Sequence, residues 1–292
     1  PPKIKLEYDI EPTKDIVRVV DCPLVVDEGA DKKELIKSLT MNVRRGEHVA
    51  IIGANGIGKT SILKLIQGII PHEGGNISWG GNVKISYFEQ EHAILDPHKT
   101  VLEEIMDRYP RLSEQQARSV LGAVLLTGEN VFKPISVLSG GERAKLCFAI
   151  MALNRGNVLV LDEPTNHLDL STKEVLEDAL AEFGGTIILV SHDRYLLNKV
   201  ASRIIEIKHD EVNSYEGNFD AYSEAVNAAS QLKMQSEAEI KRAEEEKAYK
   251  ENKARQYRSK EQRAADAQKR NRIRELEKEI EDTEVLIFEL EN

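Results

Sequence analysis

One stretch limits the possible folds of this chain more than any other: Gly53-Ala54-Asn55-Gly56-Ile57-Gly58-Lys59-Thr60, which matches the pattern G-x-x-x-x-G-K-[ST]. The apolar run Glu47–Ile52 before it predicts a buried strand, and Lys59–Gln67 predicts a helix that Gly68 ends. In that context the glycines let successive backbone N–H groups turn inward, and these groups cradle phosphate oxygens at the helix N-terminus. The alternative is a purely structural glycine-rich turn.

Side chains at the end of this loop would supply the remaining contacts to a nucleotide. We expect Lys59 to reach the β- and γ-phosphates, and the Thr60 hydroxyl to ligate Mg²⁺. The predicted nucleotide-binding set comprises the loop and the residue after it: Gly53, Ala54, Asn55, Gly56, Ile57, Gly58, Lys59, Thr60 and Ser61.

Two carboxylates follow a second apolar strand, Asn157–Leu161. A buried strand that delivers Asp162 and Glu163 to its carboxyl end suits a metal–phosphate site. We expect Asp162 to hold Mg²⁺, mostly through water, because Mg²⁺ keeps several of its waters. Glu163 would act as the general base that polarises an attacking water. The alternative is a solvated acidic strand end.

Three further features belong to the same hypothesis. The segment Leu138-Ser139-Gly140-Gly141-Glu142 has capping-box spacing, and its two glycines expose N–H groups at a helix N-terminus, which predicts a second anion site. His192 ends an apolar strand, and the logic of parallel strands brings it to Asp162 and Glu163 as a γ-phosphate contact. Gln90 closes a strand after the phosphate loop and is a further candidate ligand of the nucleotide and the metal.

The rest of the first 218 residues alternates short β-branched runs with helical stretches. Apolar strands between helices imply a sheet buried on both faces, so we expect an α/β fold. The strands Asn76–Trp79 and Lys84–Phe88 bracket Gly80-Gly81 and are predicted as a hairpin. Other predicted elements are the strand Thr186–Val190 and helices at Thr100–Arg108, Ser113–Leu126 and Ser171–Phe183.

The charge and cysteine content exclude several classes of protein. The 292 residues include 40 Lys and Arg against 50 Asp and Glu, a net charge of −10, which argues against coating nucleic acid by bulk charge. Two cysteines, Cys22 and Cys147, exclude a disulfide scaffold and fit a reducing compartment. No apolar run approaches the roughly 18–20 residues of a membrane span, and no signal peptide is visible. We therefore expect a cytoplasmic protein without membrane insertion.

The last part of the chain, from about Phe219, contains no Gly or Pro and predicts one long helix or a coiled-coil arm. Residues 241–274 carry 13 Lys and Arg against 6 Asp and Glu, with Tyr249 and Tyr257 among them, and are either a nucleic-acid contact or a solvated helix face. A heptad frame predicts a coiled coil, the alternative being a solitary charged helix; its a and d positions are Ile273, Leu276, Ile280, Thr283, Ile287 and Leu290.

Taken together and in this order, these motifs resemble the nucleotide-binding domain of ABC ATPases. The resemblance covers about residues 16–222 and identifies the Walker A motif (53–60), the Q-loop (Gln90), the signature (138–142), the Walker B motif (158–163), the D-loop (Asp169) and the H-switch (His192). It implies an ABC-type P-loop NTPase domain over 1–222, with a mixed sheet flanked by helices, a small antiparallel β subdomain and a helical subdomain at about 93–150. Residues 223–292 would form the helical extension.

Three segments are closer still to one branch, the ABC-F family: Leu161–Asp169, Val190–Tyr195 and Tyr215–Phe219. That resemblance implies an ATPase with Mg²⁺ as cofactor, acting on the ribosome as a translation factor or in antibiotic protection, with the basic segment 241–274 as a candidate contact to ribosomal RNA. Family members have two ATP-binding domains in tandem, and this chain is similar to the second one alone, followed by a coiled-coil extension.

The resemblance also implies a composite active site. ATP held by one Walker A motif would be capped by the signature of a second ABC domain, from the same full-length protein or a second copy of this chain. Where many ABC domains stack adenine on an aromatic residue, this chain has Leu24-Val25-Val26-Asp27. Two other functions remain open: an ATPase subunit of an ABC transporter, and a nucleotide-gated interaction module with little turnover.

Overall fold

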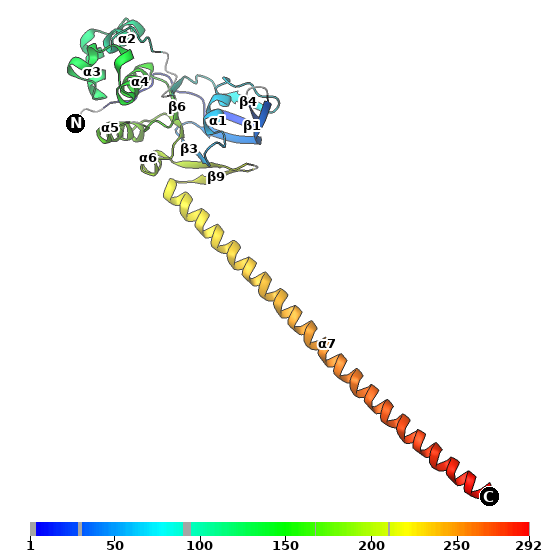
Figure 1. Cartoon of the computed structure of the whole chain (residues 1–292). Coiled ribbons are helices and arrows are strands. Elements are labelled where there is room, and N and C mark those ends of the chain that lie inside the picture. The colour runs from blue at the N-terminus through cyan, green and yellow to red at the C-terminus, as the bar shows by residue number, and fades with distance from the viewer. Residues whose placement is uncertain (1–3, 29–30, 90–94, 167, 210, 292) are drawn as a thin grey trace. The chain divides into compact units, whose positions relative to one another are not determined.

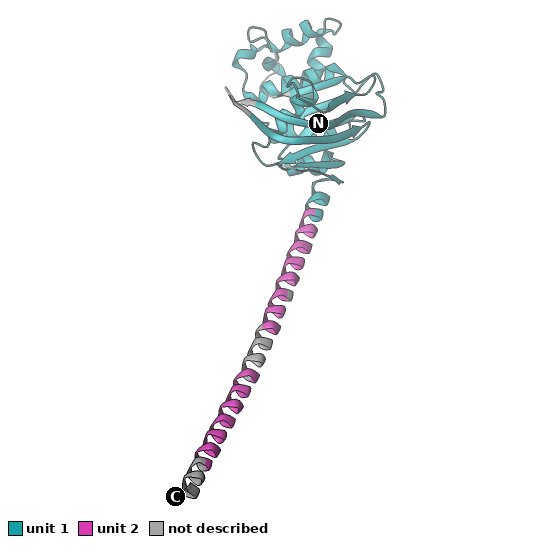
Figure 2. Ribbon diagram, turned by 90° about the vertical axis from the view of Figure 1, so that its right-hand side faces the viewer, with its two compact units in different colours: residues 1–225 teal, residues 226–292 magenta. Residues whose placement is uncertain are grey.

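The computed structural model describes residues 4–28, 31–89, 95–166, 168–209 and 211–291. The chain divides into two compact units, Pro1–Ala225 and Val226–Asn292, which Figures 1 and 2 show in full and by unit. The first unit contains two β-sheets and the helices α1 to α6. The second unit is a continuous stretch of the last helix, α7.

The larger sheet has six strands in the order β5-β6-β7-β3-β8-β9. All neighbours run parallel except β8 and β9, so the sheet is mixed, as expected. Because parallel strands end at one edge, Asp162 pairs in register with Val190, next to the end of β3. The strands are β3 (His48–Gly53), β5 (Ile85–Glu89), β6 (Val158–Asp162), β7 (Thr186–Val190), β8 (Arg203–Ile207) and β9 (Val212–Glu216).

Apolar side chains on both faces of this sheet explain its continuous hydrophobic strands. In β6, Leu159 and Leu161 belong to a core shared with α4, α5 and α6, whereas Val158 and Val160 belong to a core shared with α1 and the second sheet. The period-two alternation of side chains along a strand divides the residues between the two cores.

The smaller sheet is antiparallel, with strand order β2-β1-β4. It consists of β1 (Asp15–Glu28), β2 (Asp31–Arg44) and β4 (Asn76–Trp79). Helix α1 (Lys59–Ile66) contributes Ile62, Leu63, Leu65 and Ile66 to the core that this sheet shares with the larger one.

The predicted hairpin of Asn76–Trp79 with Lys84–Phe88 is wrong, because β4 pairs with β1 and β5 pairs with β6 in the other sheet. Asn157 separates the two strands: its side-chain amide donates to Asn82 O (2.8 Å) and its Oδ1 accepts from Lys84 N (2.8 Å). The ring of Phe88 then stacks on Phe148 of α4, with 4.3 Å between centroids.

The helices of the first unit begin at side-chain caps. Capping boxes at Thr100, Ser113 and Ser139 start α2, α3 and α4, and aspartates start α5 and α6. Helix α3 ends three residues before the predicted Leu126, since Leu125 has a left-handed φ of 63°. The bounds are α2 (Val101–Arg108), α3 (Glu114–Ala123), α4 (Gly140–Asn154), α5 (Leu170–Ala181) and α6 (Arg194–Val200), with 3₁₀ turns at Gly128–Phe132 and Ile135–Val137.

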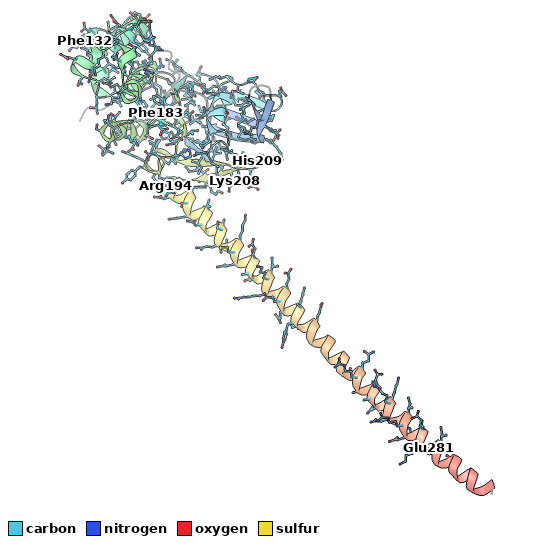
Figure 3. The ribbon with its side chains drawn as sticks, in the orientation of Figure 1. Phe132, Phe183, Arg194, Lys208, His209 and Glu281 are labelled. Carbon is cyan, nitrogen blue, oxygen red and sulfur yellow. The ribbon has the colours of Figure 1, made fainter. Side chains whose placement is uncertain are left out.

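The predicted long helix is present as α7 (Phe219–Glu291). Its first turns belong to the first unit, where the Arg194 guanidinium lies 5.3 Å from the centre of the Phe219 ring (Arg194 is labelled in Figure 3) and the Tyr222 hydroxyl donates to Glu206 Oε1 at 2.8 Å. Farther along, Ile273, Leu276 and Ile280 are exposed, while the side chains of Ile287 and Leu290 lie outside the described residues. The coiled coil therefore stays a prediction. No helix in the described part of the chain combines the length and apolar character of a membrane span.

Candidate nucleotide-binding site

The phosphate loop joins the end of β3 to the start of α1 and depends on glycine at two positions. Gly56 and Gly58 have left-handed φ values of 77° and 102°, which side chains other than glycine rarely tolerate. A Cβ at Gly58 would also lie 2.8 Å from Leu35 and 2.9 Å from Leu24. No side chain caps the first turn of α1. Its first N–H groups therefore have no side-chain acceptor, as an anion site at a helix N-terminus requires.

Lys59 places a buried cation inside this loop. Its side chain is only 7% exposed, and its Nζ donates to the carbonyl oxygens of Gly53 (3.0 Å) and Ala54 (3.1 Å). Burial lowers the pKa of Lys59, and the nearby carboxylates of Glu163 and Asp162 oppose that shift. The ammonium group is thus held in the loop by backbone oxygens, at the position where a phosphate would need a positive charge.

Glu163 occupies a strained backbone position directly after β6. Its φ of 46° is left-handed, and its N–H donates to Val190 O at 2.9 Å. The side-chain Oε2 accepts from His192 N at 3.3 Å, and Oε1 lies 3.6 Å from His192 Nε2. Burial raises the pKa of Glu163, and the His192 backbone N–H opposes the shift. A half-buried carboxylate with a raised pKa, oriented by a neighbouring strand end, suits a general base.

One cavity of about 590 Å³ collects most of the predicted site. Thr60 and Asp162 supply hydroxyl and carboxylate oxygens to it, the donor chemistry that Mg²⁺ prefers beside a bound phosphate. Its lining comprises Val26, Leu35, Asn55, Gly56, Gly58, Lys59, Thr60, Ser61, Asp162, Glu163, Asn166, Val190 and His192. Gly53, Ala54 and Ile57 instead line a neighbouring cavity of about 610 Å³ that shares His192. Gln90 lies outside the described residues.

Four of the lining residues were not predicted as ligands: Val26, Leu35, Asn166 and Val190, the last residue of β7. Val26 and Leu35 come from the paired strands β1 and β2, and they give the cavity an aliphatic wall without an aromatic ring among the described lining residues. Leu35 has no motif of its own; only the long β1–β2 pairing brings it to the loop. Asn166, three residues after Glu163, also lines the cavity, and its place in the acidic motif is the only sequence signal for it.

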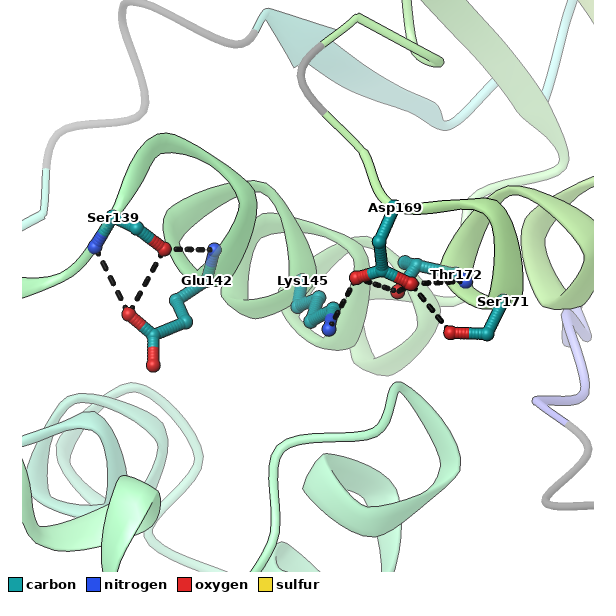
Figure 4. A network of polar contacts seen from close by, with 6 residues as sticks. All are labelled: Ser139, Glu142, Lys145, Asp169, Ser171 and Thr172. Atoms are coloured by element: carbon teal, nitrogen blue, oxygen red, sulfur yellow. Dashed lines mark hydrogen bonds and ion pairs between the residues drawn. The ribbon is translucent and has the colours of Figure 1, made fainter.

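The signature residues lie elsewhere, at the start of α4. None of Leu138–Glu142 lines the cavity that contains Lys59. Ser139 Oγ accepts from Glu142 N (3.2 Å), while Glu142 Oε2 accepts from Ser139 N (3.0 Å), the reciprocal pair drawn in Figure 4. Lys133 Nζ lies 3.0 Å from the other Glu142 oxygen. The Ser139 N–H and Lys133 lower the pKa of Glu142.

Asp169 connects the start of α5 to the middle of α4. Its carboxylate caps α5 by accepting from Thr172 N (2.9 Å) and pairs with Lys145 Nζ of α4 (2.9 Å; Figure 4). Hydrogen bonds from the Ser171 hydroxyl and Lys145 lower the pKa of Asp169. The predicted D-loop residue therefore contacts the signature helix directly through this ion pair.

A strand, a glycine-rich loop with a buried lysine, and a pair of carboxylates at the end of β6 define a P-loop nucleotide-binding domain. Comparison with known proteins narrows this class. Residues 36–166 match the family model described as ABC transporter. The chain is 40% identical over 225 residues to the putative ATP-binding protein YdiF of Bacillus subtilis, covering 77% of this chain and 35% of that protein.

Two further similarities agree with this. The energy-dependent translational throttle protein EttA of Mycobacterium tuberculosis is 39% identical over 208 residues, 68% of this chain and 37% of that protein. Among solved structures, the ATP-binding cassette MJ0796, as a dimer bound to ADP and Pi, has a TM-score of 0.59 at 24% identity and covers 69% of this chain and 98% of that one. The chain carries an ATP-binding cassette domain of the ABC-F family. It spans about a third of the length of the curated relatives that it matches.

Proposed function

We propose that this chain is an ATP-hydrolysing domain of a ribosome-associated ABC-F protein, whose active site is completed by a second ABC domain. The observation that carries the proposal is the cavity where Lys59, Asp162, Glu163 and His192 converge while the signature Leu138–Glu142 is absent from the lining. Such a site would supply the groups that bind ATP and accept a proton from one domain. The signature of that domain would remain available to a nucleotide bound by the second domain.

Nucleotide binding follows from the loop and its wall. The N–H groups of the loop residues that line this cavity and the Lys59 ammonium would hold the phosphates, and Val26 with Leu35 would cover the base or the ribose by apolar contact. Thr60 and Asp162, with Gln90, would hold Mg²⁺, which neutralises phosphate charge when bound. Without an aromatic ring on this wall, selectivity between adenine and other bases is expected to be weak.

Glu163 would accept a proton from the attacking water. As the water oxygen bonds to the γ-phosphorus, the bond between that phosphorus and the bridging oxygen breaks, releasing ADP and inorganic phosphate. The carboxylate is already oriented by the His192 backbone N–H, and its raised pKa makes it a stronger base than an exposed glutamate. His192, with a side chain 55% exposed at the same cavity, would contact the γ-phosphate.

The outer side of that phosphate would be closed by Ser139, Gly140 and Gly141 of the second domain. In a homodimer the arrangement would be two-fold symmetric, each signature capping the other copy's ATP. The Asp169–Lys145 ion pair supports this proposal, because it couples the segment after the Walker B strand to the signature helix. ATP would then act as a clamp, and hydrolysis would open it.

The ribosome is the proposed target because one relative is named a translational throttle protein and because α7 carries the basic segment 241–274. Its described side chains Lys241, Arg242, Lys247 and Lys250 are exposed, as a phosphate-contacting helix requires. Cosedimentation with ribosomes tests this: we expect binding that weakens steeply with salt. Binding to a transporter membrane subunit in place of ribosomes would identify the transporter alternative instead.

The composite site is tested by measuring ATP hydrolysis per molecule across a hundredfold dilution of the protein. We expect specific activity to rise with protein concentration, because a second Ser139–Glu142 segment must arrive. Specific activity that stays constant would identify a self-sufficient monomeric ATPase, and Ser139 would then only cap α4.

A further inference from the structure

A second cavity, of about 770 Å³, lies at the opposite edge of the sheet from the nucleotide site. Lys84, just before β5, and Arg155, just before β6, place it where these strands begin, so we call it the amino-edge cavity. The N-terminal segment, the end of α2, the middle of α3 and the end of α4 form its walls. It shares no residue with the cavity around Lys59.

The floor of the amino-edge cavity is apolar and fixed in place. Leu112, Val120 and Leu153 are partly buried and pack against the main core. Tyr109 joins them, and its hydroxyl is held 2.6 Å from Asn154 Oδ1 and 3.0 Å from Ile150 O, both on α4. The ring therefore has a defined position next to aliphatic groups, a surface suited to the flat face of a base.

The rim of the amino-edge cavity carries five cations and two carboxylates. The carboxylates are neutralised within the rim: Glu7 pairs with Lys5 (2.6 Å), and Asp9 pairs with Arg155 (2.7 Å). Arg108 pairs at 2.5 Å with Glu104, which is buried behind it.

Lys84 and Arg111 remain as the uncompensated charges of the rim. Both are exposed, and neither has an ion-pair partner among the described residues. Positive charge without a matching carboxylate is unusual in a region where residues 1–230 carry 25 Lys and Arg against 34 Asp and Glu. A ligand that contacts both these two cations and the apolar floor must combine an anionic group with an apolar face.

We infer that the amino-edge cavity binds a short stretch of single-stranded RNA, with its phosphates at Lys84 and Arg111 and its bases on the floor around Tyr109. Every unit of a nucleotide chain combines both requirements, whereas inorganic phosphate leaves the floor uncovered and an acidic peptide meets both only where an aromatic residue stands beside its carboxylates. The volume falls within the roughly 300–1,000 Å³ of pockets that enclose a small ligand, which limits the contact to very few nucleotides. The site does not depend on ATP, so it can hold or fail separately from the proposed hydrolysis.

The test is photo-cross-linking of the full chain to a short single-stranded RNA containing 4-thiouridine, followed by peptide mass spectrometry. Mapping by peptide separates this cavity from any contact made by α7. We expect cross-links on peptides that contain Tyr109–Leu112 or Leu153, with and without ATP. In the double variant Lys84→Glu, Arg111→Glu their yield should fall by at least about tenfold, because two phosphate contacts are lost.

The matched control is Lys14→Glu with Arg18→Glu, which reverses one exposed lysine and one exposed arginine outside the cavity. It should keep the cross-link yield within about twofold, since long-range charge is screened by salt. Absence of cross-links on these peptides, or equal loss in both double variants, would overturn the inference. Cross-linking by 4-thiouridine monophosphate but not by the RNA would assign the cavity to a free nucleotide. Equal displacement by polyglutamate would show a site that recognises charge alone.

Discussion

Helices α1 and α4 both begin at a glycine-rich motif, yet they begin in different ways. Helix α1 follows Gly58, which has a left-handed backbone conformation and provides no side-chain cap. Helix α4 instead starts at Ser139, whose hydroxyl accepts a hydrogen bond from the Glu142 N–H. The free N–H groups of α1 are open to a phosphate. At α4 one of those groups is already satisfied within the helix, and a carboxylate lies at the positive end.

The charges around the two helix starts also differ, because the start of α1 has a cation available to a ligand and the start of α4 has an internal ion pair. Lys59 is buried beside the α1 loop and held by backbone carbonyls, so the cation is in place before any ligand arrives. At α4, Glu142 and Lys133 neutralise each other at 3.0 Å. In the proposed function, α1 would therefore be a preorganised anion site, whereas α4 would be a conditional one, which must exchange internal contacts for an external phosphate. This order suits a clamp in which binding precedes closure.

The largest expected effect is on hydrolysis at the α1 site. Glu163→Gln preserves the shape of the side chain and an oxygen for the His192 N–H, but it removes the proton acceptor, so kcat should fall by about 10²–10⁴-fold. ATP binding, measured by calorimetry, should persist. Glu177→Gln, at another buried glutamate that lines neither cavity at the phosphate loop, is the control and should hydrolyse normally. An unchanged rate in Glu163→Gln would remove Glu163 as the base.

The next effect is on binding at the same helix start. Lys59→Ala removes a charge-assisted contact to phosphate, which is worth roughly 1.5–3 kcal/mol, so ATP affinity should weaken about ten- to hundredfold. Lys64→Ala, on the last turn of α1, is the matched control and should leave affinity unchanged. Equal affinity in the two variants, with folding intact, would contradict the preorganised site.

A smaller effect separates the two anion sites directly. Ser139→Arg should leave ATP affinity within about twofold and abolish the rise of specific activity with protein concentration, because it blocks the conditional site alone. Ser113→Arg is the matched control: Ser113 caps α3 with the same box geometry, through Gln116. Each variant should lose roughly 0.5–2 kcal/mol of stability with its cap. If both variants abolish the concentration dependence, or neither does, Ser139 has no role beyond capping.

Much of the first unit was predictable because the hydrophobic pattern and the turn residues of each segment favour the same structure as the tertiary fold. The strand Thr186–Val190 matches β7 to the residue, since four consecutive apolar residues after Thr186, between a pair of glycines and a polar turn, permit few alternatives. The loop 53–60 was predictable for a similar reason, because glycines with left-handed φ leave a signature in the sequence.

The predictions from sequence fail where a contact between residues far apart in the chain determines the local structure. Gly80-Gly81 has the local appearance of a hairpin turn, but Asn157, far along the chain, binds the backbone at Asn82 and Lys84 and directs β5 to the other sheet. Leu35 reaches the nucleotide cavity only through the pairing of β1 with β2. The left-handed φ of Glu163 has no sequence signal either, since glutamate does not favour it.

The smallest expected effect compares the contributions of two glutamates to stability: Glu163, in the cavity beside the start of α1, and Glu142, at the start of α4. Both have an ordinary pKa near 4.5, but burial raises the pKa of Glu163, while the Ser139 N–H and Lys133 lower that of Glu142. A raised carboxyl pKa means that ionisation destabilises the fold, so Glu163 lowers stability above its folded pKa and this penalty vanishes as the pH falls toward 4.5. A lowered pKa means the opposite: Glu142 adds stability above 4.5, which is lost as the pH falls through its folded pKa.

Thermal unfolding of the two Gln variants as a function of pH makes the difference measurable. At neutral pH, Glu163→Gln should raise Tm and Glu142→Gln should lower it, by a few degrees at most, since water still reaches both carboxylates and weakens their interactions. As the pH falls, the gain from Glu163→Gln should shrink first, above 4.5, and the loss from Glu142→Gln only below it. Shifts of the same sign at neutral pH would mean that the surroundings of the two helix starts affect a carboxylate alike, and the difference in charge between the two sites would not hold.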